Sequence, residues 1–282
     1  MKSLLTPREL ADAIGVSESS VRRWVDAGHI PMTRTQGGHR RIAIDDALRY
    51  LREIQADIPR PQVLGLEHFA IAGAEDQALL AALSAGDAVS ARGILLSLYV
   101  SGRHVSRIFD GPVRSVLAKL GDHGARDLAA TLVEHRAMDI CLQAVCQLRS
   151  LLIPPADAPL AIGAAPAGDP STLPSMMVAA VLADAGFREA NLGPNTPVEP
   201  LGQLATEKKA RLVWLSITTA PNAEKLLGEI DRLSRTLNEQ KIPLVLGGRI
   251  VRDFVVRDRP NLHVVSTMAE LAAFARGITA GV

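Results

Sequence analysis

Residues 17–41 read SESSVRRWVDAGHIPMTRTQGGHRR, and the N-terminal part of the chain is organised around this stretch. Ser17 is a residue type that caps helix N-termini by accepting a backbone hydrogen bond. Val21, Trp24 and Val25 then follow the i, i+3, i+4 spacing of one helix face, so we expect them to pack inward. After this helix, two adjacent glycines stand within a basic stretch, which indicates the tip of a hairpin because glycine permits positive φ.

Another helix is predicted upstream, from a capping box in residues 6–9 (TPRE) to Gly15, a residue type common at helix C-caps. A turn of three residues, GVS at 15–17, separates the two predicted helices. Helix, short turn and helix is the helix-turn-helix pattern, in which the second helix enters the major groove of DNA. Downstream, Asp45 is expected to cap a third helix.

The arginines of this region form a local basic patch. Between Val21 and Arg41 there are five arginines and one acid, Asp26, whereas the whole chain of 282 residues has a formal charge of +1. A nucleic-acid contact must therefore come from this patch and not from a general basic coat. The candidates on the helix and then in the hairpin are Ser19, Ser20, Arg22, Arg23, and Arg34, Gly37, Gly38, His39, Arg40 and Arg41. The alternative is a small helical domain with a solvated arginine face.

Residues 4–54 resemble the winged-helix reader of the MerR and excisionase-type regulators. The stretch TPRELADAIGVSESSVRRWVDAGHIP followed by TQGGHRRI is close to the usual pattern of that group. The residues at the positions that this pattern expects are Trp24, Gly37, Gly38, His39 and Arg40. The resemblance implies a winged helix-turn-helix domain with double-stranded DNA as its partner. Because small readers of this kind bind weakly alone, we also expect a homo-oligomer.

The chain is predicted to contain a DNA-binding domain, a linker, a helical bundle and an α/β domain, with bounds 1–56, 57–66, 67–153 and 158–282. Hydrophobic residues make up 48% of the sequence, enough for sizeable cores. The N-terminus, MKSLLTPREL, lacks an apolar run of signal length, and no stretch approaches about 20 apolar residues. We therefore expect a cytoplasmic protein without a membrane segment.

Residues 67–153 show helical periodicity interrupted by glycines, which predicts about four antiparallel helices in a small bundle. The longest of these helices contains the adjacent pair Glu134 and His135. His123 precedes it within residues 121–124 (GDHG), which are expected to form an interhelical turn. A Glu-His pair on a helix is most often solvent-exposed, so these residues alone do not indicate a site.

Residues 158–282 alternate apolar strands with amphipathic helices, which predicts a flavodoxin-like, Rossmann-like parallel sheet of five strands with helices on both faces. Ligands of such folds bind at the carboxyl ends of the strands. The sequence has no G-x-G-x-x-G, no G-x-x-x-x-G-K, no nucleophile elbow and no metal-ligand spacing. We therefore expect neither an enzyme nor a metal site.

The α/β domain resembles the cobalamin-binding domain, and the bundle resembles the helical cap that covers the upper face of cobalamin. All three parts together resemble the MerR-type cobalamin photoreceptor repressors, the CarH and LitR group. The positions that match this family's tail-contacting hydroxyls, paired glycines and cap pair are Ser216, Thr218, Gly247, Gly248, Glu134 and His135.

The first loop of the α/β domain departs from the family pattern. The family has Asp-x-His-x-x-Gly with a histidine that ligates cobalt, whereas residues 169–174 of this chain read DPSTLP. Ser171 replaces the ligand, and a hydroxyl is a poor cobalt ligand compared with imidazole. Pro174 replaces the glycine beside which the nucleotide tail threads. The family's cap tryptophan is also missing, and His123 is a candidate to replace it or to act as an upper ligand. The candidate ligand-binding residues in the loop itself are Asp169, Ser171 and Thr172.

These observations predict a DNA-binding transcriptional regulator, a repressor by resemblance, controlled by a sensor domain without the usual axial histidine. Three kinds of signal stay open. The first is cobalamin bound without a lower protein ligand, and the second is another chromophore or small molecule in the same cleft. The third involves no small ligand, and a partner protein or oligomerisation is then the signal. Two other function classes stay open. One is a corrinoid-dependent enzyme component, which would need the missing histidine. The other is a scaffold whose N-terminal domain docks protein instead of DNA.

Overall fold

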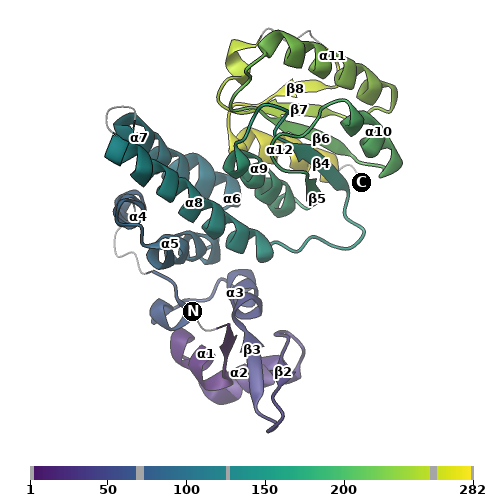
Figure 1. Ribbon diagram of the computed structural model, residues 1–282. Helices are drawn as coiled ribbons and strands as arrows, with labels where there is room; N and C mark the ends of the chain where they lie inside the picture. Colours follow the sequence, from purple (N-terminus) through teal and green to yellow (C-terminus); the bar gives the residue numbers. More distant parts are fainter. Residues whose placement is uncertain (1–2, 68–72, 125–127, 255–258, 281–282) are drawn as a thin grey trace. The chain divides into compact units, whose positions relative to one another are not determined.

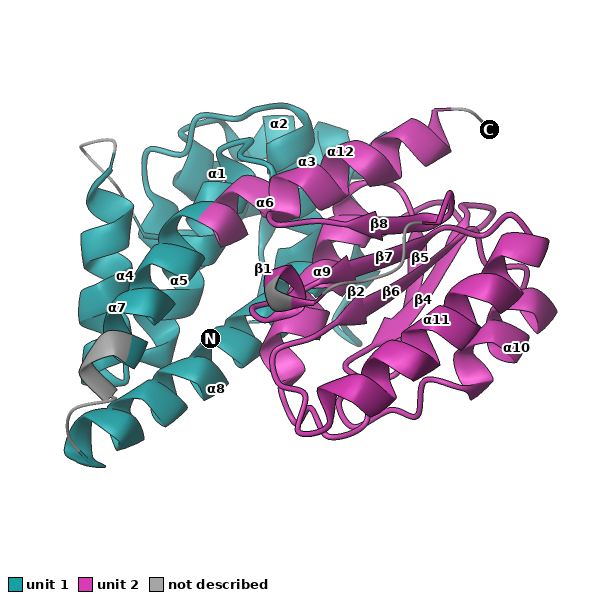
Figure 2. Cartoon of the chain, turned by 90° about the horizontal axis from the view of Figure 1, so that it is seen from above, with its two compact units in different colours: residues 1–104, 111–151 teal, residues 105–110, 152–282 magenta. Residues whose placement is uncertain are grey.

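The computed structural model describes residues 3–67, 73–124, 128–254 and 259–280. The chain divides into two compact units, coloured separately in Figure 2 and shown with element labels in Figure 1. Unit 1 comprises residues 1–104 and 111–151, and unit 2 comprises residues 105–110 and 152–282. None of the described helices is both long enough and apolar enough to cross a membrane.

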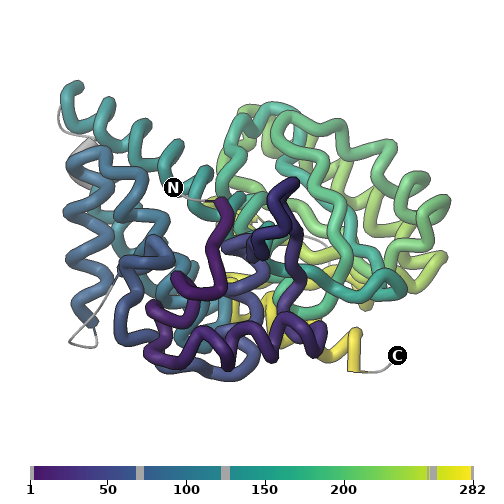
Figure 3. Tube along the Cα trace, turned by 90° about the horizontal axis from the view of Figure 1, so that it is seen from below, coloured from purple at the N-terminus to yellow at the C-terminus, as the bar shows by residue number. Residues whose placement is uncertain are grey.

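Unit 1 begins with a small domain of helices and short strands, which Figure 3 traces in purple and blue. Its elements are β1 (Leu4–Leu5), α1 (Pro7–Ile14), α2 (Glu18–Asp26), β2 (Thr33–Arg34), β3 (Arg40–Ala43) and α3 (Ile44–Glu53). β3 lies between β1 and β2 and pairs antiparallel with both, so β2 and β3 form a hairpin. β1 was not predicted, because two residues that pair with a distant strand leave no local pattern.

The helix ends of this domain follow from local side-chain chemistry. The N–H of Glu9 donates to Thr6 Oγ1 (3.2 Å) and the N–H of Thr6 donates to Glu9 Oε2 (2.8 Å), which confirms the predicted capping box. Ser17 caps α2 by accepting from the N–H of Ser20 at 3.1 Å. The prediction for Asp45 is wrong. α3 begins at Ile44 with Ala43 as its cap, so Asp45 lies inside the first turn of the helix.

The segment after α3 packs against the N-terminal domain. Residues 61–64 form a short 3-10 helix, η1 (Pro61–Leu64), which contacts α1. Leu64 in this helix has no exposed surface. Just before it, Arg60 forms an ion pair with Asp12 of α1, with 2.6 Å between Nη2 and Oδ1. The segment is therefore a connection packed against α1.

The rest of unit 1 is helical, and its helices pack against one another as in Figure 1. They are α4 (Ala74–Ala85), α5 (Ala88–Val100), α7 (Arg114–Gly124) and α8 (Leu128–Ser150). The turn predicted at residues 121–124 is wrong, because α7 continues as a helix to Gly124. The first turns of α8 expose two leucines, Leu128 (77%) and Leu132 (64%).

Unit 2 is a parallel sheet of five strands with helices on both faces, which confirms the prediction of a parallel α/β fold. Its elements are β4 (Leu160–Ala164), α9 (Thr172–Asp184), β5 (Arg188–Asn191), α10 (Pro200–Glu207), β6 (Leu212–Ser216), α11 (Ala223–Glu239), β7 (Leu244–Gly247), η3 (Val251–Asp253), β8 (Leu262–Val264) and α12 (Met268–Thr279). The strand order is β5-β4-β6-β7-β8. The order reverses at β4, which makes the loops after β4 and β6 the topological switch point.

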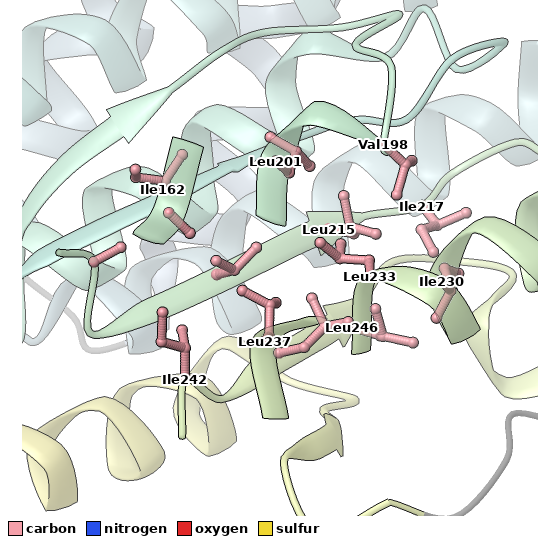
Figure 4. Close-up of a cluster of buried hydrophobic side chains, with 14 of the residues drawn as sticks. Ile162, Val198, Leu201, Leu215, Ile217, Ile230, Leu233, Leu237, Ile242 and Leu246 are labelled. Atoms are coloured by element: carbon pink, nitrogen blue, oxygen red, sulfur yellow. The ribbon is translucent and has the colours of Figure 1, made fainter. Parts of the chain in front are cut away.

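Each face of this sheet has its own pair of covering helices. α9 and α12 contact each other and lie over one face, while α10 and α11 lie over the opposite face (Figure 1). Figure 4 shows the second layer, where Leu233 and Leu237 of α11 lie near Leu215 and Leu246 of the strands. The alternation of strand side chains between the two faces produces these two separate cores.

Residues 105–110, which lie between α5 and α7 in the sequence, belong to unit 2. α6 (Val105–Ile108) leads into a turn of π-helix (Phe109–Val113), in which Gly111 has non-helical angles of φ −88° and ψ −108°. The carboxylate of Asp110 accepts from the first two N–H groups of α12, at 2.9 and 2.8 Å. Asp184, the last residue of α9, accepts from the first N–H of α6 at 3.3 Å. Two aspartates therefore hold this segment within unit 2.

Candidate nucleic-acid interface and ligand site

The exposed side of α2 carries the predicted base-reading residues. Arg22 and Arg23 are exposed, as are Ser19 and the cap Ser17. Arg22 Nη2 lies 2.7 Å from Glu18 Oε1 one turn earlier, and 54% of the Arg22 side chain remains accessible. An exposed pair of this kind is worth at most about 1 kcal/mol, so Arg22 can exchange Glu18 for a phosphate at low cost.

The hairpin that follows α2 holds its backbone in a tight tip. In the ladder, Thr33 lies opposite Arg41 and Arg34 opposite Arg40. The loop is closed by the N–H of Gly38 donating to the carbonyl of Thr35 (2.8 Å) and the N–H of Thr35 donating to the carbonyl of His39 (3.0 Å). Gly38 has φ +75°, a left-handed conformation that favours glycine.

The predicted hairpin residues differ in their exposure. Arg34, Gly37, Gly38 and His39 are all exposed. Arg40 and Arg41 are partly buried, and Arg41 Nη1 donates to the carbonyl of Arg40 at 3.0 Å. Arg40 Nη2 forms an ion pair with Asp26 Oδ1, the last residue of α2, at 2.7 Å.

Trp24 lies at the junction of α2 and α3. The sequence predicts that it packs inward with Val21 and Val25, and both valines are buried while Trp24 is partly exposed. Its ring lies 5.5 Å from the ring of Tyr50 on α3, in a tilted arrangement, and the ring of His29 stacks on Tyr50 at 6.3 Å. These contacts fix α2 against α3, so they set the direction of the exposed arginine face.

Seven of the predicted ligand residues lie at the carboxyl ends of the strands of unit 2. Asp169 has no exposed surface. Its Oδ2 accepts from the N–H groups of Thr218 (2.5 Å) and Thr219 (3.1 Å), and its Oδ1 accepts from the N–H of Ser171 (3.0 Å). The carboxylate thus ties the loop after β4 to the loop after β6. Ser171 is the N-cap residue of α9 but makes no side-chain cap hydrogen bond, and Thr172 is the first residue of that helix.

Ser216, Gly247 and Gly248 complete this edge of the sheet. Ser216 at the end of β6 is 2% exposed and lies opposite Gly247 of β7 in the parallel ladder. A Cβ on Gly248 would lie 2.2 Å from the carbonyl oxygen of Ile217, and the φ of Gly248 is +120°. Gly248 therefore lets the chain after β7 approach the chain after β6 closely.

The other predicted ligand residues lie in unit 1. Glu134 is partly buried against α7, where a Cβ on Gly121 would lie 3.4 Å from Glu134 Oε1. His135, the next residue on α8, is exposed. His123 lies in the last turn of α7, and its side chain is outside the described part of the chain.

A buried polar chain beneath α9 was not predicted. Trp214, 1% exposed, lies opposite Gly163, and a Cβ on Gly163 would be 2.1 Å from Trp214 Cδ2. Trp214 Nε1 donates to Ser175 Oγ (3.3 Å), Ser175 Oγ donates to Asn191 Oδ1 (2.9 Å), and the N–H of Gly193 donates to the same Oδ1 (3.1 Å). The indole thus fills the space between the sheet and α9. A tryptophan within an apolar strand, with a glycine on the neighbouring strand, is the signal that could have indicated it.

Family models match both ends of the chain. Residues 4–54 match a helix-turn-helix domain, and residues 159–273 match a B12 binding domain. No match was found among curated proteins. The chain therefore combines these two domains, and their combination fits a regulator better than an enzyme.

Three solved structures are similar to most of the chain to different degrees. The monomethylamine corrinoid protein of Methanosarcina barkeri is 19% identical with a TM-score of 0.53, over 71% of this chain and 96% of that chain. The methanol:cobalamin methyltransferase complex of Methanosarcina barkeri is 18% identical with a TM-score of 0.36, over 75% and 82% of the two chains. A cobalamin-binding protein from Desulfitobacterium hafniense is 15% identical with a TM-score of 0.37, over 72% and 98%. The first of these likenesses shows a common fold.

The donor set of unit 2 does not fit a cobalt ion ligated by an imidazole of this domain. Residues 152–282 contain one histidine, His263, which lies on β8 with its ring 4.4 Å from that of Phe274. Ser171 occupies the predicted ligand position, where only a hydroxyl is available. Within the described ranges no three histidine, cysteine or acidic residues are grouped so that they could hold a metal ion. The indole of Trp214 moreover fills the space between the sheet and α9.

Proposed function

We propose that this protein is a DNA-binding transcriptional regulator, a repressor, in which a sensor built on the B12-binding fold controls a winged helix-turn-helix reader. The observation that carries the proposal is the match of residues 4–54 to a helix-turn-helix domain on the same chain as a B12 binding domain. The exposed Arg22 and Arg23 on α2, with Arg34 and His39 in the hairpin, support it because cationic side chains are available for phosphates.

Within this proposal, residues 1–56 are the reader, with the hairpin of β2 and β3 as the wing, and residues 57–66 are the linker. Residues 67–153 are a four-helix bundle that corresponds to a cobalamin cap, and residues 158–282 are the sensor. A signal at the sensor shifts the population of chain arrangements, which changes how the readers of a cytoplasmic homo-oligomer meet their half-sites.

A corrinoid is the first ligand class to test at the sensor, because the similar structures are named as corrinoid or cobalamin proteins. The missing imidazole favours a corrinoid held without a protein ligand below the metal, or another chromophore or small molecule at the same strand ends. The candidate contacts there are Asp169, Ser171, Thr172, Ser216, Thr218, Gly247 and Gly248. Gel filtration after mixing with hydroxocobalamin in the dark tests this, and co-elution of colour with the protein supports a corrinoid.

DNA retention tests the reader. The purified chain should retard a duplex carrying the promoter region upstream of its own gene at low salt. Replacing Arg22 and Arg23 with glutamine should weaken this retention, because both guanidinium groups face solvent on α2. Arg276→Gln, at an exposed position on α12, is the matched control and should retain the duplex as the wild type does. If the wild-type chain ignores DNA at low salt, the proposal is wrong.

A further inference from the structure

The ion pair between Asp26 and Arg40 joins the last residue of α2 to the first residue of β3. Arg40 Nη2 lies 2.7 Å from Asp26 Oδ1, and the two residues are 14 positions apart in the sequence. The pair therefore spans the turn between the helix and the hairpin. It is a contact through which the direction of the hairpin is coupled to that of the helix.

Arg40 is less exposed to solvent than Arg22 and Arg34. Only 27% of its side chain is exposed, and its Nε is buried without a hydrogen-bond partner. Arg22 on α2, in contrast, has 54% of its side chain exposed, and Arg34 opposite Arg40 in the ladder is exposed. Because half as much of its side chain is accessible and its Nε is buried, Arg40 is less well placed than Arg22 to reach a phosphate.

Asp26 is a negative charge within a patch that would meet a polyanion. Simple electrostatics predicts that such a carboxylate weakens DNA binding. Its presence is explained if it fixes Arg40, because a hairpin held in one direction loses less conformational entropy when it meets the groove. Asp26 is 54% exposed, so the pair lies at the rim of the domain and not in its core.

We infer that Arg40 is a positioning residue, which fastens the hairpin to α2 through Asp26 and does not itself contact DNA. The inference rests on the proposed function, since it assigns roles within the proposed reader. The exposed hairpin residues left to contact DNA are then Arg34 and His39, with the glycine tip between them.

The test compares Asp26→Asn with Glu18→Gln. Each substitution removes one negative charge from α2, and each removes the charged partner of one arginine, Arg40 or Arg22. If charge alone matters, both variants bind DNA more tightly. On the positioning account, Asp26→Asn lowers the affinity by about 2- to 5-fold, the range for an exposed pair, while Glu18→Gln does not lower it. In a double-mutant cycle, Arg40→Gln should add little to Asp26→Asn.

Hydrogen exchange gives a second readout that needs no DNA. The N–H groups of Thr35 and Gly38, which close the hairpin, should exchange faster in Asp26→Asn than in the wild type. In Glu18→Gln their exchange rates should equal those of the wild type. Unchanged exchange, or DNA affinity equal to or above that of the wild type in Asp26→Asn, overturns the inference. If the wild type retains no DNA, the proposed function fails, and the exchange rates alone decide whether the pair fixes the hairpin.

Discussion

Replacing Asp169 with asparagine should destabilise unit 2 while leaving its shape nearly unchanged. The carboxylate has no exposed surface and accepts three backbone N–H groups, two at Oδ2 and one at Oδ1. An amide has one acceptor oxygen, so in either orientation at least one N–H group faces an NH₂ group. An unsatisfied buried donor costs about 1–3 kcal/mol, and the remaining bonds lose the benefit of a charged acceptor. We therefore expect a loss of about 2–4 kcal/mol in the free energy of unfolding of unit 2.

Tryptophan fluorescence during urea unfolding measures this loss. The chain has two tryptophans, Trp24 in unit 1 and the buried Trp214 in unit 2, so a Trp24→Phe background reports on unit 2 alone. The midpoint for Asp169→Asn should fall by about 1–2 M urea with an unchanged slope. Asp157→Asn, in an exposed turn, is the control and should stay within about 0.5 kcal/mol of the background. A similarly small effect for Asp169→Asn would refute the role of its carboxylate as a tie between loops.

Gly163→Ala should cost about 2–3 kcal/mol and change the emission of Trp214, because a Cβ at residue 163 would overlap the indole; unchanged emission and stability would contradict this packing. Asp110→Ala should lower the stability of unit 2 by about 1–2 kcal/mol in the same urea assay, because the first N–H groups of α12 lose their acceptor. Ellman's reagent should modify the exposed Cys146 quickly and the buried Cys141 only on unfolding. Burial raises the pKa of Cys141 from 9.0 to about 12. The unfolded chain therefore releases this proton at lower pH than the native chain. Stability should accordingly fall between pH 9 and 12 by about 1.4 kcal/mol per pH unit, and a flat profile there would contradict the shift.

Features set by neighbouring residues were predictable from the sequence. The capping box at Thr6 and the cap at Ser17 depend on side chains that reach only three residues along the chain. The parallel strands of unit 2 were predictable because burial on both faces makes each of them continuously apolar. The same reasoning placed the start of α3 wrongly, at Asp45. Ala43 takes the extended cap conformation without a capping side chain, so the helix starts before Asp45.

Features set by distant residues were not predictable. α6 belongs to unit 2 because Asp110, just after it, binds the start of α12, which lies far along the chain. Likewise, the indole of Trp214 can pack beneath α9 only because Gly163 on the neighbouring strand has no side chain. At the reader, the arginines could be named from their spacing. Which of them faces solvent and which is bound to Asp26 depends on the direction of the hairpin.

The salt dependence of DNA affinity tests the central claim most directly. If the exposed arginines of α2 and the hairpin in two readers of a homo-oligomer together meet about six phosphates, log Kd plotted against log salt has a slope of about 5, and affinity falls about 10³-fold between 50 and 200 mM salt. Replacing Arg22 and Arg23 with glutamine should lower that slope by about one to two units. A slope that these substitutions leave unchanged would contradict the account, because DNA would then be held elsewhere on the chain.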